Sequence, residues 1–109
     1  MKVISVKTFF VLYNKFTGVI IENNKTISFF KNGKYHRKNG PAYILNESVE
    51  WHANGLVHRE CGPAIIWQDG RKYWWFKENC YGIDNDFNIE TWKEKVKELK
   101  RKEKLKIFL

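Results

Sequence analysis

A seven-residue motif occurs twice in this chain, at residues 36–42 and 58–64. The first copy reads His-Arg-Lys-Asn-Gly-Pro-Ala and the second reads His-Arg-Glu-Cys-Gly-Pro-Ala. Each copy follows an Asn-Gly pair, at residues 32–33 and 54–55. A fixed period in a short chain is typical of stacked repeats, in which each unit packs on its neighbours. The period therefore predicts a repeat array, and the length of 109 residues predicts a single domain.

The repeat pattern divides most of the chain into three units, at residues 19–42, 43–64 and 65–87. The third unit is degenerate, because Asn79-Cys80 stands where the other units carry Asn-Gly, and no His-Arg motif follows. Degeneracy is expected in a terminal repeat, which has no further neighbour to pack against. The extended-looking N-terminal segment is expected to cap the first edge, so that residues 1–87 form one repeat sheet.

Each unit has the pattern of a β-hairpin. Asn-Gly tolerates positive φ at both central positions of a type I′ turn, whose twist matches that of paired strands. Apolar and polar residues alternate before the turns, with Ile27 and Phe29 in one unit and Val49 and Trp51 in the next. The predicted fold class is therefore mainly β with a C-terminal α-helix, in which stacked β-hairpin repeats form an antiparallel meander.

Residues 88–109 change to a helical pattern and form a basic amphipathic helix. Asn88 is a suitable N-cap, and Phe87 and Trp92 have the spacing of a hydrophobic staple. We expect the apolar face to cover the sheet or its open end. Trp74 and Trp75 should point to opposite faces of their strand, so at least one of them needs such a cover. The apolar face comprises Ile89, Trp92, Val96 and Leu99.

Composition and motifs do not favour an enzyme. The chain has no glycine-rich phosphate loop, no informative pair of carboxylates and no second metal-ligand pair beside His58-x-x-Cys61. We therefore expect no catalytic residues, no metal and no cofactor. Two cysteines without a signal-peptide pattern favour reduced thiols and a cytoplasmic location.

The two His-Arg pairs allow two interpretations. A row of arginines one hairpin apart could bind anions, because each guanidinium offers a planar fork of donors. Alternatively, each pair bonds the backbone or a carboxylate of the neighbouring unit and locks the stacking. We favour the second interpretation, since a residue repeated in every unit more often serves the repeat than a ligand.

The Asn-Gly-x-x-His stretches at residues 32–36 and 54–58 resemble the MORN repeat family. The resemblance implies a twisted antiparallel sheet that acts as a scaffold or binding surface. Where that family commonly places glycines after the histidine, this chain has Arg-x-x-Gly-Pro-Ala. This variant resembles repeats of small proteins from bacteriophages and large DNA viruses. The resemblance covers roughly residues 19–87, with two good copies.

These features lead to two hypotheses about function. The first is a non-enzymatic phage or viral protein that would act in the host cytoplasm, where it binds a host protein and inhibits a defence or regulatory factor. The second is nucleic-acid binding, or blocking of a nucleic-acid-binding enzyme, because the net charge is +8 and aromatic residues are abundant. Membrane binding is the least favoured, and an open sheet edge would permit an edge-to-edge dimer. The candidate partner-binding residues are Arg37, Arg59, Arg71, Lys72, Trp74, Lys97, Lys100, Arg101 and Lys104.

Overall fold

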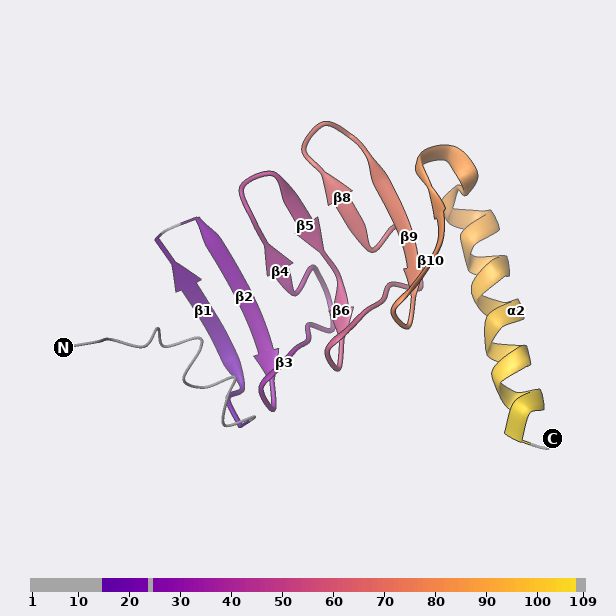
Figure 1. Ribbon diagram of the computed structural model, residues 1–109, viewed down its shortest axis with the longest axis horizontal. Coiled ribbons are helices and arrows are strands. Elements are labelled where there is room, and N and C mark those ends of the chain that lie inside the picture. Colours follow the sequence, from indigo (N-terminus) through magenta and orange to yellow (C-terminus); the bar gives the residue numbers. More distant parts are fainter. Residues whose placement is uncertain (1–14, 24, 108–109) are drawn as a thin grey trace.

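The computed structural model describes residues 15–23 and 25–107, except the side chains of the last two of these, and shows a row of β-hairpins that ends at a helix (Figure 1). The predicted N-terminal capping strand lies outside the described residues. The elements are β1 (Gly18–Glu22), β2 (Thr26–Lys31), β3 (Lys34–Tyr35), β4 (Tyr43–Ile44), β5 (Ser48–Glu50), β6 (His52–Ala53), β7 (Leu56–Val57), β8 (Ile65–Trp67), β9 (Lys72–Phe76), β10 (Asn79–Ile83), the 3₁₀-helix η1 (Asp84–Asp86) and the helix α2 (Ile89–Ile107).

The strands form an antiparallel meander, which confirms the predicted fold class. The main sheet has the order β1-β2-β4-β5-β8-β9-β10, with β3 paired to the end of β2, and β6 and β7 form a separate pair. Each unit contributes two hairpins where the sequence predicted one. A long hairpin joins the main sheet, and a short one carries the Asn-Gly turn or its equivalent (Figure 1).

The tight turns need residues that accept positive φ. Asn32 and Gly33 have φ of 52° and 77°, and the pair at 54–55 has φ of 52° and 86°. In the third unit the turn lies at Lys77 and Glu78, with φ of 45° and 71°. The prediction that Asn79-Cys80 forms this turn is therefore wrong. Asn79 instead pairs with Phe76 as the first residue of β10.

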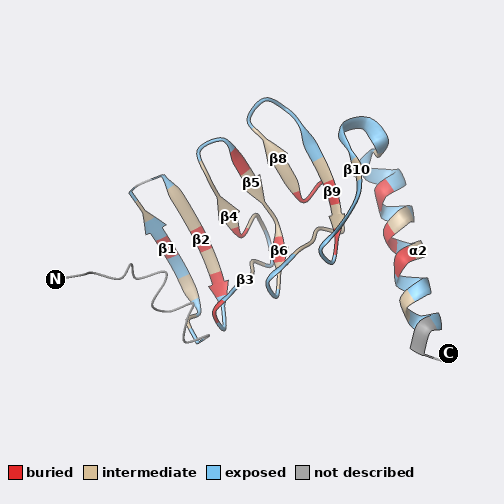
Figure 2. Ribbon diagram, viewed as in Figure 1, coloured by how far each residue is buried: buried red, intermediate tan, exposed pale blue. Residues whose placement is uncertain are grey.

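Helix α2 packs against the last strands through three of the four predicted apolar residues, Trp92, Val96 and Leu99, whereas Ile89 is 54 % exposed. Asn88 caps the helix, because its Oδ1 accepts the N–H of Thr91 at 2.8 Å while the Thr91 hydroxyl accepts the N–H of Asn88 at 2.9 Å. The staple also forms, with the rings of Phe87 and Trp92 5.0 Å apart. Buried residues line the side of α2 that faces the sheet (Figure 2), and the core there comprises Trp74, Phe76, Trp92, Val96 and Leu99.

Candidate binding surface

The motif histidines join each unit to the next. The Nδ1 atom of His36 accepts the N–H of Asn54 at 3.0 Å, and Nδ1 of His58 accepts the N–H of Lys77 at the same distance. Both donors are the first residue of the next unit's tight turn. Because Nδ1 accepts, the proton of the neutral ring lies on Nε2. The prediction that the His-Arg pairs lock the stacking is confirmed for the histidines.

The guanidinium groups of the motif arginines bond within their own unit, whereas their backbone N–H groups donate to His52 and Trp75 of the next units. The guanidinium carbon of Arg37 lies 4.0 Å from the centre of the Phe29 ring, and Nη1 donates to the carbonyl of Pro41 at 3.3 Å. On the other side, a Cβ added to Gly40 would lie 2.9 Å from the guanidinium carbon, which is closer than van der Waals contact allows. The arginine is therefore held between a ring and a glycine, and a larger residue at position 40 would displace it.

The second copy repeats this arrangement. The guanidinium carbon of Arg59 lies 3.8 Å from the centre of the Trp51 ring, and Nη1 donates to the carbonyl of Pro63 at 3.1 Å. A Cβ added to Gly62 would lie 3.0 Å from the same guanidinium carbon. Partial burial lowers the pKa of the Arg59 guanidinium from its ordinary value. The alanine that ends each motif is fully buried, at 0 % exposure for both Ala42 and Ala64. Every identical position of the motif thus has a structural role.

A groove lies between the two motif loops, with a volume of about 760 Å³. One wall consists of residues 36–41 and the other of residues 58–61, and Trp51, His52 and Ala53 lie between them. Arg37, Lys38 and Arg59 bring positive charge to this groove, and Glu60 is the only acidic residue among the described residues that line it.

The carboxylate of Glu60 already has two partners within the chain. Its carboxylate binds Nζ of Lys100 at 2.6 Å and Nε2 of His58 at 3.2 Å. Burial raises the pKa of Glu60, but the hydrogen bonds from Lys100 and His58 outweigh that effect, so the pKa lies below its ordinary value of 4.5. The ion pair joins α2 to the second motif loop and compensates the one negative charge of the groove.

Lysines gather along one side of α2. Lys93, Lys97, Lys100 and Lys104 follow one another at intervals of three and four residues, so they share one flank of the helix. The contact of Lys100 with Glu60 shows that this flank borders the second motif loop. Within the described chain, Lys93 and Lys104 have no carboxylate partner, whereas Lys97 pairs with Glu94 at 3.3 Å. We call this set the lysine flank.

The motif loops and the helix lie on one face of the sheet. Phe29, Trp51 and Trp74 each stand three residues before a tight turn, which places their side chains on the same face. The loops cover the first two rings and α2 covers the third, with the Trp74 and Trp92 rings 5.6 Å apart. We call this the motif face. It carries the groove and the lysine flank next to each other.

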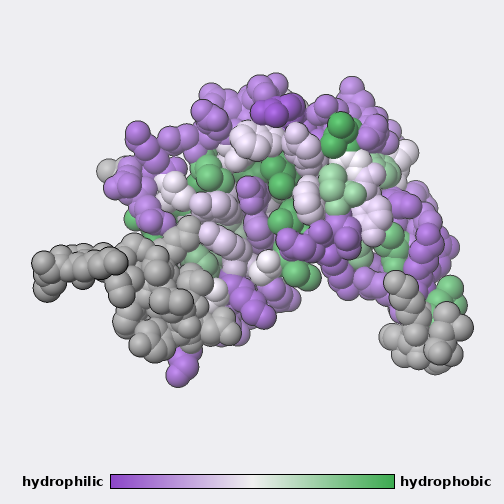
Figure 3. All heavy atoms as spheres, viewed as in Figure 1, coloured by the Kyte–Doolittle hydropathy of each residue, from purple (hydrophilic) through white to green (hydrophobic). Residues whose placement is uncertain are grey.

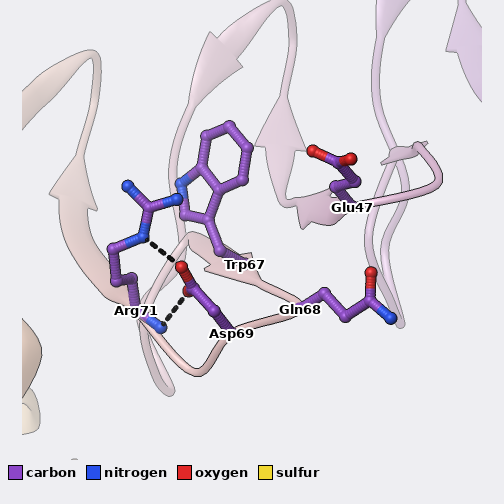
Figure 4. Close-up of a pocket in the computed structure, with 5 residues that line it drawn as sticks. All are labelled: Glu47, Trp67, Gln68, Asp69 and Arg71. Atoms are coloured by element: carbon purple, nitrogen blue, oxygen red, sulfur yellow. Dashed lines mark hydrogen bonds and ion pairs between the residues drawn. The ribbon is translucent and has the colours of Figure 1, made fainter.

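Arg71 lies in a different place, at the turn between β8 and β9 (Figure 4). Its Nε binds Asp69 at 2.7 Å, its backbone N–H binds the same carboxylate at 3.0 Å, and its guanidinium lies 4.8 Å from the centre of the Trp67 ring. Figure 4 shows these groups side by side at the edge of a small pocket. The hydrogen bonds from Arg71 lower the pKa of Asp69. This arginine is therefore paired and compensated by its own turn.

The structure thus separates the candidate residues that the sequence grouped together. Trp74 is only 3 % exposed, and its indole N–H donates to the Asp84 carbonyl, so it belongs to the core and not to the exposed surface. Lys72 is exposed on β9, where its backbone N–H binds Asp84 Oδ1. Arg37 and Arg59 line the groove, Lys97, Lys100 and Lys104 lie on the lysine flank, and Arg101 lies on the outer side of α2.

Sequence reasoning missed two contributors. Glu60 occupies a variable motif position, and only its spatial proximity to Lys100 reveals its role.

Thr17 takes the place of the motif histidine in a partial unit that precedes the first full unit, because its Oγ1 accepts the N–H of Asn32 at 3.0 Å. The neighbouring N–H of Gly33 binds the Phe16 carbonyl, as Gly55 binds Tyr35 in the next unit. Residues 16–18 carry no motif residue that would have signalled this unit.

Comparisons with family models, curated proteins and solved structures find no match to this chain. The resemblance to MORN repeats therefore stays a prediction that rests on the motif residues. Within the described chain, no helix has the length and apolarity to cross a bilayer, and no three His, Cys, Asp or Glu residues are grouped to hold a metal ion. Cys61 and Cys80 are exposed free thiols.

Proposed function

We propose that this protein is a small, non-enzymatic binding module that contacts a protein partner with an acidic surface through its motif face. The observation that carries the proposal is the juxtaposition of the cationic groove and the lysine flank, joined by the Lys100–Glu60 ion pair. Complementary charge steers association and selects partners, even where it adds little to affinity. In the phage or viral setting that the repeat variant suggests, the partner is a host defence or regulatory protein that the module inhibits.

The aromatic residues favour a protein over a single-stranded nucleic acid. Non-specific binding of single strands uses exposed rings on which bases stack. Here Trp74 and Trp92 are 3 % and 0 % exposed, and the Phe29 and Trp51 rings each lie beneath a guanidinium. In the view of Figure 3, hydrophilic residues cover the turns and α2, while hydrophobic residues gather between them. These four rings, which lie next to the groove and α2, are therefore covered and offer no open face for a base.

Nucleic-acid binding remains the second candidate because of the lysine flank. Four lysines along one side of a helix could contact a phosphate backbone through charge alone. Such binding would weaken steeply as salt rises, roughly in proportion to the number of phosphates contacted.

A tagged capture from lysate of a plausible host, with and without nuclease, separates these candidates. We expect a stoichiometric protein that stays bound after nuclease treatment. Loss of every bound protein on nuclease treatment, with recovery of nucleic acid before it, would replace the proposal by the second candidate. Recovery of no partner in either arm would contradict both candidates.

A further inference from the structure

We propose that the groove between the two motif loops binds a carboxylate-rich, extended segment of the protein partner. This inference rests on the proposed function, because it names the part of a partner that the motif face would hold. It concerns residues 36–41 and 58–61, which line a groove of about 760 Å³. Neither the motif resemblance nor the locking role of the histidines requires such a ligand.

The charge of the groove is the first reason. Its lining includes Arg37, Lys38 and Arg59, whereas its one carboxylate, Glu60, is already bound by Lys100 and His58. Among the described residues, the side chains of both arginines hydrogen-bond only to a proline carbonyl, through Nη1. A guanidinium has five N–H donors, so each arginine keeps donors for a ligand. The groove therefore offers positive charge and unused donors with no negative charge left to compensate them.

The rigidity of the two arginines is the second reason. Each guanidinium is held between an aromatic ring and a glycine, at 4.0 Å from the Phe29 ring for Arg37 and 3.8 Å from the Trp51 ring for Arg59. Long side chains normally lose rotamer freedom when they bind, and that loss weakens binding. Here the fold has already fixed them. Preorganised arginine forks favour planar bidentate acceptors such as carboxylates.

The repeat spacing is the third reason, and it suggests the shape of the ligand. Phe29 lies in β2 and Trp51 directly follows β5, with β4 between these strands, so the two arginine positions are roughly 10 Å apart at about 4.8 Å per strand. In an extended peptide, residues two or three positions apart span about 7–10 Å. Two acidic side chains of one extended segment can therefore reach both arginines. A nucleic acid would gain less, because the Trp51 ring that lines the groove already lies beneath Arg59.

The test measures binding of a fluorescently labelled hexaglutamate peptide to the full chain by anisotropy, with hexaglutamine and an oligothymidylate as comparison ligands. Substitution of the arginines themselves risks the fold, so the variants change exposed lining residues. Lys38→Glu and Cys61→Glu place negative charge in the groove. Lys25→Glu makes the same charge change as Lys38→Glu at the turn between β1 and β2, outside the groove lining.

We expect hexaglutamate to bind and hexaglutamine not to bind. Lys38→Glu should weaken binding about tenfold or more, Cys61→Glu should also weaken it, and Lys25→Glu should change it by less than about twofold. Equal weakening by Lys38→Glu and Lys25→Glu, or tighter binding of the oligothymidylate, would overturn the inference. If hexaglutamate fails to bind while a nuclease-resistant partner is still captured, the groove inference fails and the proposed function stands. If hexaglutamate binds and no partner is captured, the groove is a carboxylate-binding site but the proposed function fails.

Discussion

The indole N–H of Trp92 donates a hydrogen bond to the backbone carbonyl of Arg59 at 2.9 Å. This bond connects the C-terminal helix to the second motif loop, 33 residues earlier in the chain. The same loop carries Glu60, whose carboxylate binds Nζ of Lys100 on the lysine flank of the helix. The helix is therefore the structural end of the array. It covers Trp74 as the motif loops cover the equivalent rings, and it holds the lysine flank beside the groove.

Substitutions of Trp92 test this connection. Trp92→Phe keeps a ring in the core but leaves the Arg59 carbonyl without its donor, so we expect a loss of about 1–3 kcal/mol in the free energy of unfolding. Trp92→Ala also empties a fully buried site and should cost about 3–5 kcal/mol. Urea denaturation of both variants measures the difference. Equal losses for the two variants would show that the volume of the Trp92 ring adds nothing to the cost of losing its hydrogen bond.

Gly62→Ala tests the confinement of the arginine. The added Cβ would lie 3.0 Å from the Arg59 guanidinium carbon and would shift the guanidinium by a few tenths of an ångström over the Trp51 ring, so we expect a loss of about 1 kcal/mol or less. In a chain that already carries Arg59→Ala, the same change should cost much less. A double-mutant cycle measured by urea denaturation gives this coupling directly. Additive losses would mean that Gly62 is needed for another reason.

Thr17→Val tests the partial unit that precedes the array. The change keeps the shape of the side chain but removes the oxygen that accepts the N–H of Asn32, so we expect a loss of about 1 kcal/mol. Thr26→Val is the matched control, because the Thr26 hydroxyl has no hydrogen bond to any described residue. Thermal unfolding of both variants provides the comparison. A control that loses as much stability as Thr17→Val would remove the assigned role of Thr17.

Glu60 predicts a pH dependence. Its pKa is lowered in the folded chain, so its ionised form stabilises the fold above the ordinary value of 4.5, and this stabilisation is lost as pH falls through the lower folded pKa. Glu60→Gln should therefore be less stable than the parent chain near neutral pH, and the gap should close in acid. Unfolding free energies of both chains across this pH range test the prediction. A gap that stays constant with pH would show that the Glu60 charge does not stabilise the fold.

The sequence predicted those parts of the fold that depend on local signals. The Asn-Gly turns, the Asn88 cap and the Phe87–Trp92 staple each need only residues that are close in sequence. The third turn was misplaced because Lys77 and Glu78 carry no turn signal, and they adopt positive φ only because the flanking strands pair around them.

The candidate surface was less predictable because it depends on long-range contacts. The Lys100–Glu60 pair joins residues 40 positions apart, so no spacing rule pointed to it. The sequence also grouped Trp74 with Lys72 and Arg71 as neighbours in the chain. The strand instead turns Trp74 toward α2, and Arg71 pairs with Asp69 in its own turn. Adjacent residues of one strand serve different surfaces, and only the packing of the helix decides which one is covered.

The most direct test of the proposed binding role compares two charge-reversed chains in nuclease-treated capture. One carries Lys93→Glu, Lys97→Glu and Lys104→Glu on the lysine flank, and the other carries Lys15→Glu, Lys25→Glu and Lys31→Glu at the opposite end of the array (Figure 1). All six lysines are exposed, and the net charge changes equally. We predict that the first chain loses its protein partner and the second retains it. Retention by both chains, or equal loss from both, would contradict the assignment of binding to the motif face.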